Sequence, residues 1–132
     1  MVLQESGEMY LESILVLIRQ GKAVRSIDIV DYMGYSKPSV SRAVGILKKN
    51  GYIIMDGSGH LYLTDEGRSV AEKTFERHRV LTKVFTKLGV SAGIAAEDAC
   101  KIEHVLSSQS FQAIKKHITQ GNELPADMKE EE

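Results

Sequence analysis

The 132-residue sequence contains one cysteine, no tryptophan and only two prolines. A single cysteine excludes an intramolecular disulfide framework and a zinc site built from four cysteines. No apolar run approaches the roughly 20 residues that a membrane-spanning helix needs. The N-terminus has no basic segment ahead of an apolar core, so we expect no signal peptide. These absences indicate a cytoplasmic protein made of one or two small globular domains.

Net charge is also small, at -1, and gives no global indication of nucleic-acid binding. The charge is nevertheless unevenly distributed. Residues 123–132 carry a net charge of -4, which leaves +3 over residues 1–122. Residues 36–50 contain four basic side chains and no acidic one. We therefore interpret residues 123–132 as an acidic tail and residues 36–50 as a candidate phosphate-binding segment.

Apolar residues recur at helical spacing along most of the chain, interrupted by two short β-type runs. Ser26 and Ser36 are the predicted N-caps of the second and third helices. Gly34 and Tyr35 predict a tight turn between these two helices. The pattern predicts helices over residues 7–19, 25–33, 36–50, 64–88, 95–107 and 110–119, with a hairpin formed by residues 52–55 and 60–63.

The order helix, tight turn, helix, hairpin is that of a winged helix-turn-helix, whose second helix enters the major groove of DNA. In the helix over residues 36–50, Val40, Val44 and Leu47 point inward, so the basic side chains and serines face outward. Lysine, arginine and serine side chains contact phosphate. The alternative is a solvated basic face without a partner. The candidate DNA-contacting residues are Ser36, Lys37, Pro38, Ser39, Ser41, Arg42, Lys48, Lys49 and Ser58.

A second group of candidate functional side chains lies near the end of the sequence. Cys100, Glu103 and His104 are spaced i, i+3, i+4, which places them on one face of a helix. Thiolate, carboxylate and imidazole are the main ligand types for transition metals, and a fourth ligand must come from another element. The alternative is a buried cysteine that behaves as a small apolar residue beside a surface Glu–His pair.

Five segments of the sequence carry a resemblance to a known family. They are Glu8-Met9-Tyr10-Leu11-Glu12, Ser36-Lys37-Pro38-Ser39-Val40-Ser41, Leu63-Thr64-Asp65-Glu66-Gly67, Arg77-His78-Arg79 and Cys100-Lys101-Ile102-Glu103-His104-Val105-Leu106-Ser107. Residues 6–120 resemble the metal-dependent repressors of the diphtheria toxin repressor and manganese transport regulator family. The resemblance implies a mainly α fold, with a winged helix-turn-helix DNA-binding domain over residues 1–68 and an all-helical metal-binding and dimerisation domain over residues 69–122.

The resemblance also implies a primary metal site formed by Met9, Cys100, Glu103 and His104. Members of the iron-responsive branch carry Met and Cys at these positions, whereas the manganese branch has Asp and Glu instead. Thioether and thiolate ligands favour Fe(II), Co(II), Ni(II) or Zn(II) over Mn(II). We therefore expect Fe(II) as the physiological effector, with Mn(II) as the alternative and the other metals as ligands in vitro.

Glu12 and His78 match family ligands and form a possible second metal site, to which Glu103 could bridge. The iron-type second site is incomplete, because Thr82 and Ala96 stand where that branch has a carboxylate and a histidine. Alternatively, Glu12 and His78 only orient the ligands of the first site. Larger family members carry an SH3-like domain after this point, and we expect this chain to correspond to the short form.

The expected function is that of a repressor of metal-homeostasis genes, not an enzyme. It would bind palindromic double-stranded operator DNA as a homodimer when loaded with metal. Two alternatives differ in class. One is a thiol redox sensor that uses Cys100 on the same fold. The other is a small metallohydrolase, although the sequence offers no catalytic loop for one.

Overall fold

The computed structural model describes residues 5–119. It divides the chain into two compact units, which we call unit 1 (Met1–Phe75) and unit 2 (Glu76–Glu132). The division falls within a long helix, and the domain boundary expected after residue 68 stays a prediction. The acidic tail expected over residues 123–132 lies outside the described residues.

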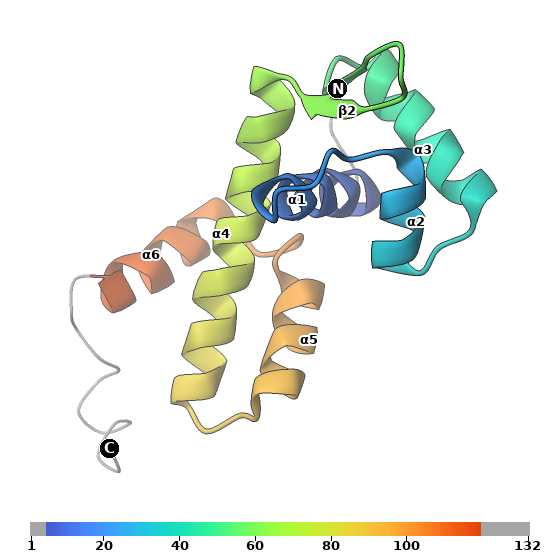
Figure 1. Cartoon of the computed structure of the whole chain (residues 1–132). Coiled ribbons are helices and arrows are strands. Elements are labelled where there is room, and N and C mark those ends of the chain that lie inside the picture. Colours follow the sequence, from blue (N-terminus) through green and yellow to red (C-terminus); the bar gives the residue numbers. More distant parts are fainter. Residues whose placement is uncertain (1–4, 120–132) are drawn as a thin grey trace. The chain divides into compact units, whose positions relative to one another are not determined.

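The elements follow the predicted order of three helices, a hairpin and three further helices (Figure 1). Most of the predicted bounds hold to within one or two residues. Within the described residues, no helix combines the length and hydropathy that crossing a membrane requires. The elements are α1 (Glu5–Arg19), α2 (Ser26–Met33), α3 (Lys37–Lys49), β1 (Ile53–Met55), β2 (Leu61–Leu63), α4 (Asp65–Lys87), α5 (Ala92–Ile102) and α6 (Ser108–Thr119).

Unit 1 is built around an apolar core to which α1, α2, α3 and the hairpin all contribute. The predicted inward residues of α3 are confirmed, because Val40, Val44 and Leu47 are all at least 96% buried. Burial of such side chains contributes roughly 1.5–3 kcal/mol each. The completely or almost completely buried members of the core are Leu11, Ile14, Leu15, Ile29, Val40, Ile53, Leu61 and Ala71.

The N-cap of α3 is confirmed, and that of α2 differs by one residue. The Ser36 hydroxyl accepts a hydrogen bond from the Ser39 amide at 3.2 Å, as an N-cap does. The N-cap of α2 is Arg25, so the prediction of Ser26 is wrong. The reason is that the Asp28 carboxylate accepts from the Arg25 amide at 2.9 Å, which supplies the reciprocal bond of a capping box one residue earlier.

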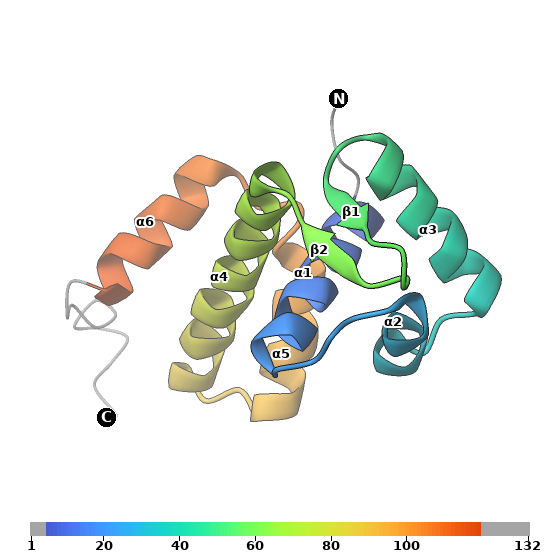
Figure 2. The ribbon, with the colours of Figure 1, turned by 45° about the horizontal axis from the view of Figure 1, so that its top comes forward.

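The hairpin is antiparallel and packs its inner face on the core of unit 1 (Figure 2). Ile53 pairs with Leu63 and Met55 with Leu61. The Leu61 amide also donates to the carbonyl of Val24 at 2.8 Å, which ties the hairpin to the loop between α1 and α2. This hairpin is the wing of the winged helix-turn-helix that the sequence predicts.

Unit 2 contains the second half of α4 together with α5 and α6. Leu81, Ala95, Ala99 and Phe111 are its buried apolar residues. The prediction that the fifth helix continues to Ser107 is wrong, because α5 ends at Ile102. After a turn, the Ser107 hydroxyl accepts from the Ser110 amide at 3.0 Å and caps α6.

Candidate metal centre and nucleic-acid interface

The recognition surface, defined as the outward face of α3, is basic and open to solvent. Lys37, Arg42, Lys48 and Lys49 are all exposed. Lys48 and Lys49 lie in the last turn, where the helix dipole favours positive charge. Pro38 and Ser41 are also exposed. The predicted orientation of this helix within unit 1 is therefore confirmed.

Two of the predicted phosphate-contacting serines have a structural role as well. The Ser36 hydroxyl caps α3 and also donates to the Ser39 hydroxyl at 2.9 Å. Ser41 is exposed and lies on the first turns of α3. The side chain of Ser41 is therefore better placed than that of Ser36 to form a new hydrogen bond without loss of the cap.

The tip of the wing is organised by the carboxylate of Asp56. One oxygen of this carboxylate accepts from the amides of Ser58 and His60, both at 2.9 Å. The other accepts from the hydroxyl of Tyr62 at 3.2 Å. The His60 amide makes the largest contribution to lowering the pKa of the Asp56 carboxyl. Ser58, the predicted contact residue, stands exposed at this tip.

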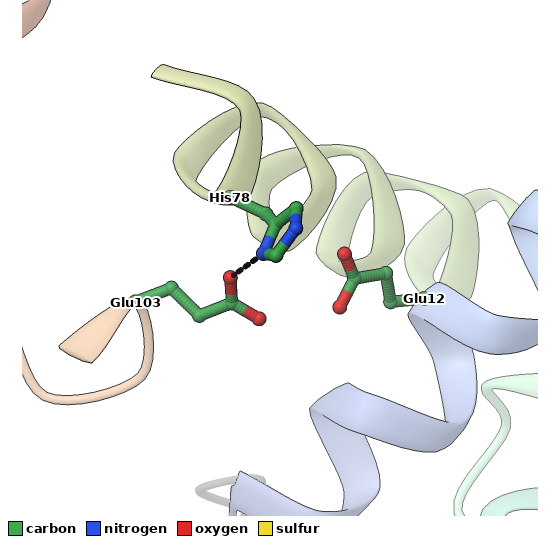
Figure 3. Close-up of side chains that lie close together, drawn as sticks. All are labelled: Glu12, His78 and Glu103. Carbon is green, nitrogen blue, oxygen red and sulfur yellow. Dashed lines mark hydrogen bonds and ion pairs between the residues drawn. The ribbon is translucent and has the colours of Figure 1, made fainter. Parts of the chain in front are cut away.

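A polar cluster in unit 2 is centred on the carboxylate of Glu103, which has no exposed surface. One carboxylate oxygen lies 3.0 Å from Nδ1 of His78 on α4 (Figure 3). The other lies 3.3 Å from Nε2 of His104, whose side chain is 2% exposed. We call Glu103, His78 and His104 the buried cluster, after the Glu103 carboxylate and the His104 side chain; the third member, His78, is 30% exposed.

The chemistry of the buried cluster fits a divalent cation. A carboxylate removed from water is destabilised unless positive charge or hydrogen bonds compensate it. Two imidazoles flank this one, and imidazole is neutral when it binds a metal. Oxygen and nitrogen donors gathered in a buried place are a donor set that Fe(II), Mn(II) and Zn(II) accept. A cation bound here would balance the charge of the Glu103 carboxylate.

The remaining predicted ligands lie on α1 and α5. Cys100 is half-buried in the last turn of α5, three residues before Glu103. Glu103 keeps a helical conformation and its amide donates to the carbonyl of Ala99, so the helical spacing from Cys100 is preserved. His104 follows in the turn after α5, and not in the helix as predicted.

Met9 and Glu12 belong to α1 in unit 1, and both are half-buried. The carbonyl of Met9 accepts from the hydroxyl of Ser13 at 2.8 Å, as is usual for a serine inside a helix. Within unit 1, burial and then the Glu12 carboxylate raise the pKa of the Tyr32 phenol.

Arg77 makes polar contacts in unit 2, and the sequence predicts no role for it. Its guanidinium donates to the backbone carbonyls of Glu103 and Leu106, at 3.0 and 2.6 Å. The only signal in the sequence is its position directly before His78 in the Arg77-His78-Arg79 motif.

Two ranges of the chain match models of known protein families. Residues 2–61 match the family model of the iron dependent repressor N-terminal DNA binding domain. Residues 64–129 match that of the iron dependent repressor metal binding and dimerisation domain. The chain belongs to the family of metal-dependent transcriptional repressors described by these two models.

Individual relatives agree with this assignment. The transcriptional regulator MntR of Escherichia coli O6:H1 is 34% identical over 106 residues, which cover 80% of this chain and 68% of MntR. The diphtheria toxin repressor of Corynebacterium diphtheriae is 28% identical over 81% of this chain and 48% of its own length. The structure of the manganese regulator SloR has a TM-score of 0.76 at 24% identity, covering 90% of this chain and 55% of that one. The last likeness concerns the fold alone.

Proposed function

We propose that this chain is a homodimeric repressor that binds palindromic operator DNA when Fe(II) occupies a site containing Glu103 and His104. The observation that supports it is the buried cluster of unit 2, which gathers two imidazoles around a carboxylate without exposed surface. The basic recognition surface of α3 supplies the complementary DNA-binding function.

The proposed primary ligands are Met9, Cys100, Glu103 and His104, with Glu12 and His78 in a second site or as orienting groups. Met9 and Glu12 belong to unit 1 and the other residues to unit 2. One cation bound by both sets would therefore link the two units. Such a link would favour one spacing of the recognition helices in a dimer, and an operator with half-sites one helical turn apart selects that spacing.

Cys100 is the reason for preferring iron. A thiolate and the thioether of Met9 are softer ligands than oxygen, and Mn(II) prefers oxygen. Iron is therefore expected to hold the site with these two residues, while metal binding releases the thiol proton of Cys100. The affinity should fall when the pH is lowered or when the thiol is oxidised.

A manganese-responsive regulator is the second candidate. The contacts around Glu103 join oxygen to imidazole nitrogen, and Mn(II) accepts both donors. The relatives named above include the transcriptional regulator MntR of Escherichia coli O6:H1. Glu12 and His78 would matter more for this metal than Met9 and Cys100.

The deciding experiment is an anaerobic DNA-binding titration. A duplex is first selected from a random-sequence pool with the Fe(II)-loaded protein and, separately, with the Mn(II)-loaded protein. Fluorescence anisotropy then gives the affinity for each selected duplex with Fe(II), with Mn(II) and with chelator. We expect chelator to release both duplexes. A metal-free protein that binds either duplex as tightly as the loaded protein contradicts metal activation.

Cys100→Ser separates the two metals. For an iron site we expect this variant to lose the response to Fe(II) while it keeps its thermal stability. For a manganese site it should respond to Mn(II) like the wild type. Ser107→Ala is an unsuitable control because Ser107 caps α6. Ser91→Ala is the matched control, since Ser91 precedes α5 and its side chain makes no capping bond.

A further inference from the structure

The turn that follows α5 carries two of the proposed ligands and contains little regular structure of its own. It spans residues 103–106, between the end of α5 and the Ser107 cap of α6. Its internal bonds are those from the amides of Val105 and Leu106 to the carbonyl of Ile102, at 3.1 and 3.0 Å. A turn with so few internal bonds needs external contacts to hold one conformation.

Arg77 provides such contacts from α4. A single nitrogen of its guanidinium, Nη1, donates to the carbonyl of Glu103 at 3.0 Å and to that of Leu106 at 2.6 Å. These two carbonyls are the first and the last of the turn. The same guanidinium lies 5.1 Å from the ring centre of Phe111, which is 2% exposed on α6. One side chain thus connects α4, the turn and α6.

Arg77 and His78 are consecutive residues that hold Glu103 at two points. Arg77 binds its backbone carbonyl, and His78 binds its carboxylate at 3.0 Å. With both contacts present, the position and the direction of the Glu103 side chain are fixed relative to α4. His104, the next residue, is positioned by the same backbone.

We propose that Arg77 is a positioning residue that pre-forms the turn 103–106 so that Glu103 and His104 are placed for a divalent cation. This inference rests on the proposed metal-binding function and adds to it a residue that does not touch the metal. A pre-formed turn spares the binding step the entropy of ordering these residues. Residues that fix the ligands of a metal commonly change its affinity by roughly 10- to 100-fold.

The test uses Co(II) as the probe, whose absorption reports coordination directly. Arg77→Met keeps an unbranched apolar stem and removes the donors. We expect it to weaken Co(II) binding roughly 10- to 100-fold. In the metal-free protein, we expect faster amide hydrogen exchange at Val105 and Leu106 and unchanged exchange in α1–α3. Lys83→Met, at an exposed position of the same helix, is the matched control.

Arg77→Lys provides the second variant. Both carbonyls accept from one nitrogen of Arg77, so an ammonium group can replace it, and we expect most of the Co(II) affinity to return. This variant also remains informative if Arg77→Met fails to fold. Wild-type affinity and wild-type exchange in both variants would overturn the positioning role. A wild-type chain that binds no Co(II) would instead overturn the proposed function, and the metal part of this inference with it.

Discussion

The recognition surface of α3 and the buried cluster of unit 2 are both rich in ionisable groups, yet they present them in opposite ways. Lys37, Arg42 and Lys48 stand in water, whereas the Glu103 carboxylate has no exposed surface and the His104 side chain only 2%. Exposed charges contribute little to folding, because water already solvates them. Buried charges depend on their immediate partners.

The recognition surface and the buried cluster therefore derive their selectivity from different sources. The recognition surface can bind an anion without any rearrangement of unit 1, and salt will screen that attraction. The buried cluster is little affected by salt and strongly affected by the identity of each neighbour. Substitutions on α3 should therefore lower DNA affinity by graded amounts. Substitutions around Glu103 should cause a near-complete loss of the response to metal.

Glu103→Gln should produce the largest effect. The amide is isosteric but carries no charge, so the cation loses the carboxylate that balances it. We expect the metal dependence of DNA binding to disappear, a larger loss than the roughly 10- to 100-fold caused by removing an orienting partner. Isothermal titration with Co(II) measures the loss of metal binding. DNA-binding assays with and without metal measure the loss of metal dependence. Glu97→Gln, exposed on α5, is the control. If Glu103→Gln keeps its metal response, the expected contrast between the recognition surface and the buried cluster is contradicted.

Gly67→Ala and Gly45→Ala compare a buried with an exposed position within unit 1, with volume in place of charge. A Cβ at Gly67 would lie 2.0 Å from the carbonyl oxygen of Tyr52, at the start of α4. Because the obstacle is backbone, we expect a loss of at least about 1–3 kcal/mol in the free energy of unfolding. A Cβ at Gly45, an exposed position of α3, would have no atom within 4 Å. Gly45→Ala should therefore stabilise the helix by about 0.5–1 kcal/mol. Urea denaturation compares the two, and equal effects would contradict the close packing of Gly67 on the Tyr52 carbonyl.

Arg42→Ala is expected to give a graded effect on DNA binding. Loss of one phosphate contact should reduce the slope of log affinity against log salt by about 1, with metal binding unchanged. The control is Lys83→Ala, which removes an exposed positive charge from α4. Fluorescence anisotropy over a range of salt concentrations measures both. If the two variants have the same slope, α3 is not the DNA-binding face.

Local signals in the sequence were sufficient to predict unit 1. The cap at Ser36 and the spacing of Val40, Val44 and Leu47 are contained within α3 itself, and the structure confirms them. The cap of α2 was misplaced by one residue, because the Asp28 side chain competes for the role through its bond to Arg25.

Unit 2 was less predictable, because its polar contacts are long-range. The end of α5 depends on the cap at Ser107 and on Arg77, which lies 26 residues before Glu103. The spacing of Cys100, Glu103 and His104 marked the segment as a candidate site, but no local pattern pairs Glu103 with His78. The family resemblance implies that Glu103 could bridge to a site containing His78, and the fold supplies the contact between the two side chains at 3.0 Å.

Protonation of Asp56 should produce the smallest effect, confined to the wing. The pKa of the Asp56 carboxyl is below its ordinary value of 3.8, mainly because the His60 amide donates to it. The ionised form therefore stabilises the folded wing above that pH, and this stabilisation is lost as the pH falls through the lowered pKa. NMR titration should show the Ser58 and His60 amide signals changing with a midpoint below 3.8. Asp56→Asn should remove this titration while leaving the unit 2 signals unchanged. A midpoint at or above 3.8 would contradict the hydrogen bonds that the Asp56 carboxylate accepts at the wing tip.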